Sequence, residues 1–240
     1  MRVDALVVAL RPRSMWEAAD LGIRLVQSDA RSVWRTVWPM YLLVLGLAFA
    51  SQALGDWEPM LVIFWCKPWL DRGLLFVLSR AVFGESSRVA DLWRNRKGVL
   101  WKRPIATFTL LRLSPWRAFV LPIDQLEGQR GAALRTRRSV MLRGQGASAS
   151  LLQFAFANLE MFLVLGIWSL GVWFAPAGHH AEALNWIGKV SKEAWVFLPY
   201  LAVVFFLEPF FVGAGFAMYL NRRVQLEAWD VEQEFRHVFA

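Results

Sequence analysis

The chain has 240 residues, of which 57% are hydrophobic and 19% are charged, and it carries 14 Trp and 18 Phe. Soluble domains carry about 25% charged residues, and Trp concentrates at membrane–water interfaces. The composition therefore excludes an ordinary soluble protein and predicts an all-α, polytopic helical membrane protein, with residues 1–240 as a single membrane domain. The 27 basic residues outnumber the 19 acidic ones, but they crowd beside apolar segments as juxtamembrane charges do, so we expect no nucleic-acid partner.

Residues 1–38 are expected to contain an N-terminal interfacial helix. Ser14 and Glu17 have the spacing of a capping box, which predicts a helix start. Apolar residues then recur on one helical face (Met15, Ala19, Gly22, Val26, Ala30, Val33 and Val37). A helix with one apolar and one charged face lies along a membrane surface, and we expect this of residues 14–30. A docking helix in solvent is the less favoured alternative, because the segment leads directly into an apolar one.

Residues 39–83 are predicted to hold the first two spans. Trp38-Pro39 marks a bend or a helix start. Residues 39–53 are almost wholly apolar but reach the spanning length of about twenty residues only with residues 33–38 added. The second span, residues 59–83, contains the stretch Lys67-Pro68-Trp69-Leu70-Asp71-Arg72. Pro68 cannot donate a hydrogen bond to the carbonyl of Phe64, which predicts a kink.

Residues 84–148 form a basic region that we expect to be cytoplasmic or interfacial. Between Ser79 and Arg143 there are fourteen basic and only four acidic residues, and basic loops stay in the cytoplasm. The pattern predicts a surface helix over 87–98, an interfacial or re-entrant segment over 99–123, and a basic amphipathic helix over 124–142. Four arginines of this region are candidate contacts for anionic lipid or a partner: Arg130, Arg135, Arg137 and Arg138.

Residues 149–220 are predicted to hold the third and fourth spans, 149–174 and 194–220, joined by a loop at 175–192. The fourth span is kinked at Pro209, directly after Glu208. Residues 221–240 read as a cytoplasmic helical tail. The proposed inner segments carry 23 of the 27 basic residues, and the outer loops carry only Lys189 and Lys192. Both termini are therefore expected in the cytoplasm.

The two halves share one plan, a surface helix, a span and a proline-kinked span. The triplet Lys67-Pro68-Trp69 parallels Glu208-Pro209-Phe210. Both halves enter and leave on the same side, so we interpret them as two parallel pseudo-repeats. Chance similarity between two aromatic-rich spans is the alternative.

Five charged residues at membrane depth form the candidate site: Lys67, Asp71, Arg72, Glu160 and Glu208. Charges in a bilayer are expensive unless they are paired. We therefore expect a structural cluster in which Lys67 or Arg72 pairs with Glu208 or Glu160, and Arg72 could instead snorkel toward the inner surface. The alternative is a pathway for ions, protons or lipid headgroups.

The sequence has no Walker A, zinc, nucleophile-elbow or dinucleotide motif, so we predict no metal, no cofactor and no enzyme activity. An intramembrane enzyme that uses Glu160 or Glu208 stays open as an alternative.

Several segments resemble a family of bacterial inner-membrane proteins, and together they extend over nearly the whole chain. They include residues 10–22, 67–72, 78–84, 112–115, 126–128, 208–216 and 219–223. The resemblance implies the membrane half of longer proteins with a further C-terminal domain, encoded beside MoxR-type AAA+ ATPases, von Willebrand factor A-like proteins and transglutaminase-like membrane proteins. It implies membership in a multi-component inner-membrane assembly served by a cytoplasmic ATPase. We accordingly expect a non-enzymatic scaffold or anchor subunit, with a transporter or lipid-handling protein as the alternative.

Overall fold

A computed structural model of the chain describes residues 12–55, 57–109, 111–174 and 197–227. In these ranges the chain forms helices and no strand. The helices are α1 (Met15–Ser28), α2 (Ala30–Ser51), α3 (Glu58–Ala81), α4 (Val89–Arg94), α5 (Arg96–Val99), α6 (Pro104–Phe108), α7 (Arg117–Gln125), α8 (Gly131–Leu142), α9 (Gly146–Trp173) and α11 (Phe197–Glu227).

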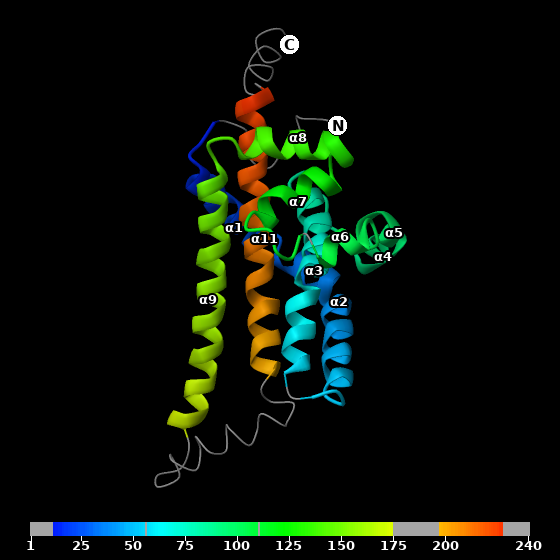
Figure 1. The fold of residues 1–240 in the computed structure, drawn as a ribbon, viewed down its shortest axis with the longest axis vertical. Helices are drawn as coiled ribbons and strands as arrows, with labels where there is room; N and C mark the ends of the chain where they lie inside the picture. The colour runs from blue at the N-terminus through cyan, green and yellow to red at the C-terminus, as the bar shows by residue number, and fades with distance from the viewer. Residues whose placement is uncertain (1–11, 56, 110, 175–196, 228–240) are drawn as a thin grey trace.

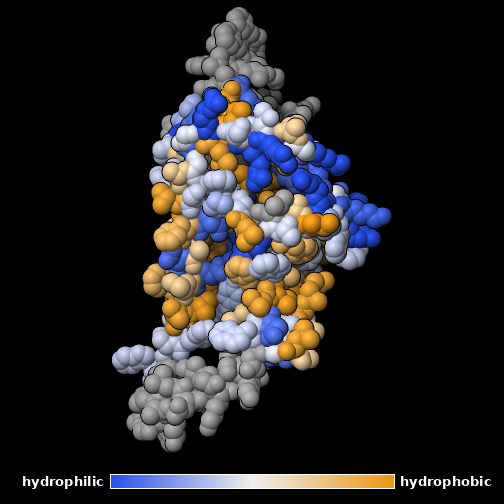
Figure 2. All heavy atoms as spheres, viewed as in Figure 1, coloured by the Kyte–Doolittle hydropathy of each residue, from blue (hydrophilic) through white to orange (hydrophobic). Residues whose placement is uncertain are grey.

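The long helices form a bundle, and the short helices gather at one end of it. Three helices are long and apolar enough to cross a membrane: α2, α9 over Gly146–Leu170, and α11. The fourth long helix, α3, has 24 residues but carries buried charges. These four helices lie side by side in the lower half of Figure 1, where Figure 2 shows mostly apolar side chains. We call α1 and α4–α8, which gather around the upper half, the dome.

Helix α1 begins where the sequence predicts, but its apolar face contacts protein. The Glu17 backbone N–H donates to Ser14 Oγ at 3.2 Å, so Ser14 is the N-cap. The buried face of α1 packs on α11, and Gly22 meets Gly213 backbone to backbone. Asn221 of α11 also accepts the Arg13 N–H and donates to the Arg13 carbonyl, both at 2.9 Å. The apolar face of α1 is therefore covered by α11 and not by lipid, and the position of this helix at the membrane surface stays a prediction.

Helices α2, α3 and α11 each continue through a proline. Helix α2 begins at Ala30, so Pro39 lies inside it and does not start it. Helix α11 runs through Pro209, whose ring nitrogen cannot donate to the Phe205 carbonyl. The indole N–H of Trp34 donates to that carbonyl at 3.2 Å, so α2 supplies the hydrogen bond that the proline removes.

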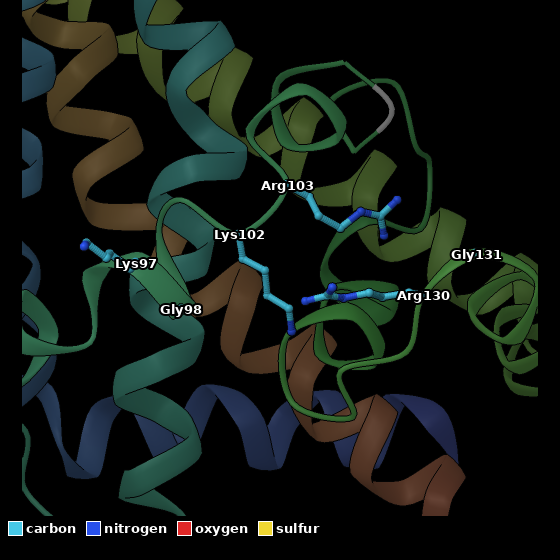
Figure 3. Close-up of a pocket in the computed structure, with 6 residues that line it drawn as sticks. All are labelled: Lys97, Gly98, Lys102, Arg103, Arg130 and Gly131. Atoms are coloured by element: carbon cyan, nitrogen blue, oxygen red, sulfur yellow. The ribbon is translucent and has the colours of Figure 1, made fainter.

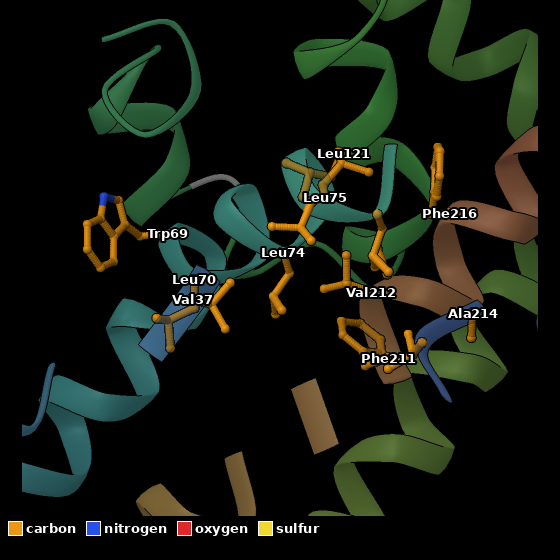
Figure 4. Close-up of a cluster of buried hydrophobic side chains, with 14 of the residues drawn as sticks. Val37, Trp69, Leu70, Leu74, Leu75, Leu121, Phe211, Val212, Ala214 and Phe216 are labelled. Atoms are coloured by element: carbon orange, nitrogen blue, oxygen red, sulfur yellow. The ribbon is translucent and has the colours of Figure 1, made fainter. Parts of the chain in front are cut away.

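The predicted single helix over 124–142 is wrong, because the segment contains two helices. Helix α7 ends at Gln125 and α8 begins at Gly131, and Gly128 and Gly131 both have positive φ, 66° and 55°. Glycine adopts this left-handed conformation without the strain that a Cβ would cause, so the chain turns here. Helix α7 is apolar and packs on α11, so it belongs to the core. Figure 4 shows its Leu121 among core side chains of α3 and α11.

The helices α4–α6 project from the side of the dome in Figure 1. They and the turn after α5 expose large apolar side chains, among them Trp93, Trp101 and Ile105. Exposed Trp beside basic residues is typical of a membrane–water interface. The interfacial or re-entrant placement of residues 99–123 stays a prediction, and residues 117–123 of this segment are buried in α7. The predicted loop 175–192, the start of the fourth span at Ala194 and the tail after Glu227 lie outside the described residues, and the parallel pseudo-repeats stay a prediction.

The contact between Gly22 and Gly213 generates a stability prediction. A Cβ at Gly22 would lie 2.1 Å from the Gly213 carbonyl oxygen. We expect Gly22→Ala to reduce the stability by about 1–3 kcal/mol, since two backbones must separate. A lower thermal unfolding temperature in detergent would be the readout. Gly46→Ala is the matched control, because nothing lies within 4 Å of a Cβ there, and equal losses for both variants would contradict the prediction.

Candidate functional site

The structure brings Lys67 of α3 between two carboxylates. Its Nζ forms an ion pair with Glu160 Oε2 of α9 and lies 2.9 Å from Glu208 Oε2 of α11. The side chains of Lys67 and Glu208 are buried, whereas that of Glu160 is 15% exposed. One lysine therefore joins three of the long helices at one depth.

Arg117 of α7 completes this group of charges, and the sequence reasoning missed it. Its Nε lies 2.7 Å from Asp71 Oδ2, and its Nη2 donates to Glu208 Oε1 at 2.5 Å. All three side chains are at most 2% exposed. Burial lowers the pKa of Arg117, but Asp71 and Glu208 more than offset this, so the pKa rises above its ordinary value. We call Lys67, Asp71, Arg117, Glu160 and Glu208 the core network.

Arg72 belongs to a separate cluster. It turns toward the dome, where its Nε donates to Thr107 Oγ1 at 2.9 Å and its Nη2 donates to Asp124 Oδ2 at 2.6 Å. Arg103 contacts the other oxygen of Asp124 at 3.1 Å. The Arg72 side chain is fully buried, so it neither pairs with Glu160 or Glu208 nor snorkels to the surface.

Apolar packing closes most of the core network, and one edge is open. The side chains of Asp71 and Arg117 are buried, and apolar side chains of α3, α7 and α11 form the core around this level of the bundle. A groove of about 410 Å³ between α3, α9 and the start of α11 reaches Glu160. The network therefore presents one carboxylate to the outside and keeps its other charges internal.

The four arginines predicted to contact anionic lipid or a partner lie in different surroundings in the structure. Arg137 binds Glu127 through two hydrogen bonds, at 2.8 and 3.0 Å, and also pairs with Glu227, so it holds α8 against α11. Arg138 is half-buried, and burial lowers its pKa, while Arg135 is exposed on α8. Arg130 is exposed at the start of α8 and lines a basic cavity.

This basic cavity has a volume of about 590 Å³ and lies between α5, the segment that follows α5, and the start of α8 (Figure 3). It is lined by Lys97, Gly98, Lys102, Arg103, Arg130 and Gly131. Lys102 donates to the Asp124 carbonyl at 2.8 Å, and Arg103 shares the Asp124 carboxylate. Within the described part of the chain no carboxylate pairs with Lys97 or Arg130, so these cations are available to an anionic group.

Two sequence signals could have identified the missed residues. The predicted cluster contained three carboxylates, Asp71, Glu160 and Glu208, but only two cations, Lys67 and Arg72. The imbalance indicated that one further buried cation was needed. The segment Ala118–Ile123 is uninterrupted apolar sequence inside a basic region, with Arg117 before it and Asp124 after it. An apolar helix flanked by opposite charges predicts burial together with charge pairing.

Comparisons of the chain with protein-family models, with curated proteins and with solved structures found no match. The resemblance to inner-membrane proteins encoded beside MoxR-type ATPases therefore stays a prediction.

The core network generates a prediction on stability. Removing one partner of a buried ion pair leaves an uncompensated charge, which costs about 3–5 kcal/mol. We expect Arg117→Met to lower the unfolding temperature more than Lys67→Met, because Arg117 faces two fully buried carboxylates and one partner of Lys67 faces the groove.

The matched test is a double-mutant cycle. Lys67→Met with Glu160→Gln should recover part of the loss, since Lys67 is the cation that contacts Glu160, with a coupling of about 0.5–3 kcal/mol. Strictly additive losses in detergent unfolding would show that this pair is not coupled.

Proposed function

We propose that the chain is a non-enzymatic subunit of a bacterial inner-membrane complex, which spans the membrane four times and anchors a partner at its cytoplasmic dome. One observation carries this proposal: the charges of the core network are paired with one another, whereas the dome presents a basic cavity with cations that have no carboxylate partner among the described residues. The buried charges stabilise the helix bundle, and the open ones suit recognition.

The four-span arrangement is supported by the pairing of the charges in α3. A helix of 24 residues is long enough to cross a bilayer. Lys67, Asp71 and Arg72 each have a partner in another helix, so none of them faces lipid. If α3 is counted as the fourth span, the positive-inside rule puts the dome, with its basic residues, on the cytoplasmic side. Both termini are then cytoplasmic as well.

The basic cavity is the proposed docking surface. Its open cations are Lys97 and Arg130, and the exposed Trp101 directly precedes Lys102, which also lines the cavity. Positive surfaces recognise complementary acidic ones and accelerate association. The partner is an acidic segment of another subunit, and a MoxR-type AAA+ ATPase is the candidate that the sequence resemblance suggests. Anionic membrane lipids are the second ligand class for the same arginines.

A lipid-handling role is the second candidate function. The groove between α3 and α9 favours it, because it connects an apolar surface to Glu160 of the core network. A transport pathway is less favoured, since Asp71, Arg117 and Glu208 are closed by packing.

The proposed topology predicts the side from which single cysteines react. In a Cys66→Ser background, Ala53→Cys between α2 and α3 should react with an impermeant thiol reagent from outside intact cells. Ser139→Cys on α8 should react only after the cells are opened. Reaction of Ser139→Cys in intact cells would contradict the proposed orientation.

The docking surface predicts the effect of charge reversal. Lys97→Glu with Arg130→Glu should reduce the amount of partner subunit that co-purifies from native membranes about tenfold or more, since charge complementarity becomes repulsion. Quantitative mass spectrometry of the purified complex measures this. The matched control is Arg135→Glu with Arg143→Glu, which makes the same charge change on exposed residues outside the cavity. Equal retention in both variants would refute docking at the cavity.

A further inference from the structure

The groove between α3 and α9 has apolar walls along most of its length. Helix α3 contributes Met60, Leu61 and Phe64, and α9 contributes four apolar side chains between Met161 and Trp168. Helix α9 packs mainly on α11, and many of its large apolar side chains are exposed. The groove therefore opens to the side of the bundle, where the membrane hydrocarbon would be.

One end of the groove carries charge of both signs. Glu160 lines it, and Tyr200 interacts electrostatically with both Glu160 and Arg112. Lys67 contacts one oxygen of Glu160, Oε2, and Tyr200 interacts with the same carboxylate, which is 15% exposed and lines the groove. The Cζ of Arg112 lies 3.3 Å from the ring centroid of Phe64, which itself lines the groove.

Arg112 has no carboxylate partner among the residues that the structure describes, and its buried Nε has no hydrogen-bond acceptor. Burial lowers the pKa of Arg112, but an arginine stays charged in proteins. A half-buried guanidinium stacked on an aromatic ring keeps its other donors for an anion, and the fork of donors suits a phosphate. This cation is separate from the basic cavity of the dome.

The charged and the apolar residues lie at opposite ends of the groove, and this arrangement sets the orientation of a bound amphiphile. From Glu160 toward Trp168, α9 runs away from the dome, so the charged end of the groove is nearer the dome and the apolar end points toward the opposite end of the bundle. An amphiphile with its headgroup at Arg112 and Glu160 would therefore have the orientation of a lipid in the leaflet on the dome side. Figure 2 shows hydrophilic side chains on this face between apolar flanks.

We propose that this groove is a binding site for a phospholipid with a primary amine in its headgroup. The phosphodiester binds Arg112, the ammonium donates to Glu160, and one acyl chain lies along the groove beside Phe64 and Trp168. The phosphate would accept from donors of Arg112 that have no acceptor in the described part of the chain, and the ammonium would join Lys67 at the partly exposed Glu160. Lipid binding in the groove is independent of partner docking at the basic cavity, because the groove and the cavity share no lining residue.

The test measures lipid binding to the purified full chain by native mass spectrometry. The detergent-solubilised protein is titrated with phosphatidylethanolamine, phosphatidylcholine and phosphatidylglycerol that have identical acyl chains. We expect phosphatidylethanolamine to bind most tightly, because a quaternary ammonium has no N–H to donate and phosphatidylglycerol has no cation. Equal retention of all three lipids would overturn the proposal.

Two substitutions separate the headgroup contacts. Arg112→Gln should weaken binding of all three lipids about tenfold, since it removes a charge-assisted contact to the shared phosphate. Glu160→Gln should abolish the preference for phosphatidylethanolamine and leave phosphatidylglycerol unaffected. Arg143→Gln is the control, because it removes an exposed arginine that neither lines the groove nor belongs to the predicted lipid contacts. A preference that survives Glu160→Gln, or affinities that Arg112→Gln leaves unchanged, would overturn the assignment.

A third variant keeps the proposal testable if the charge variants fail to fold. Leu165 lines the groove and is 49% exposed, so Leu165→Trp narrows the groove without changing any charge. It should reduce binding of all three lipids while the unfolding temperature stays at the wild-type value. If the variant binds lipid normally, or if Leu165→Cys in a Cys66→Ser background cross-links to a second protein chain through the groove, the groove does not hold a lipid.

Discussion

The contact of Arg117 with Asp71 and Glu208 is the interaction on which the rest of the structure depends. It joins α7 of the dome to the two central helices, α3 and α11, at a point closed to solvent. The geometry requires a close approach of α7 to α11, and Gly215 permits it, because a Cβ there would lie 2.3 Å from Ala118 Cβ. The small residue and the ion pair are thus two parts of one helix crossing. A buried charge that has excellent partners is tolerated, and one that loses them is strongly destabilising.

The ion pairs between the dome helices and the long helices form three groups along the bundle, which we call levels. The core network joins α3, α7, α9 and α11, while Arg72, which directly follows Asp71, joins α3 to the end of α7 through Asp124. Arg137 with Glu127 and Glu227 joins α8 to the end of α11. Each level connects a dome helix to a long helix by ion pairs. The apolar side chains between the levels are not specific to one register, so the ion pairs fix the depth at which the dome meets the bundle.

Local patterns in the sequence predict the helices well, and long-range pairing is where they fail. The apolar runs and the Ser14 cap predict α1, α9 and α11, and the cost of charge at membrane depth predicts that Lys67 has a carboxylate partner. Spacing alone does not select Arg117 from the fourteen basic residues, because its partners come from other helices, and only the apolar run Ala118–Ile123 that follows it sets it apart. The apolar face of α1 has the same pattern whether lipid or α11 covers it, so the sequence alone does not separate these surroundings. The break between α7 and α8 depends on two glycines in the left-handed conformation, which hydrophobic periodicity does not reveal.

The charged residues of α3 are synthesised well before the residues with which they form ion pairs. Under the four-span arrangement proposed above, α3 leaves the ribosome with Lys67, Asp71 and Arg72 before any of their partners exists. Glu160 follows Lys67 by 93 positions and Asp124 follows Arg72 by 52, so Asp71 and Arg72 stay unpaired until α7 is synthesised, and Lys67 stays unpaired until α9 is synthesised. A helix with three unpaired charges inserts poorly into hydrocarbon. Stable insertion of α3 is therefore a late event in biogenesis, coupled to the arrival of α7, α9 and α11, and the second half of the chain acts as an assembly factor for the first.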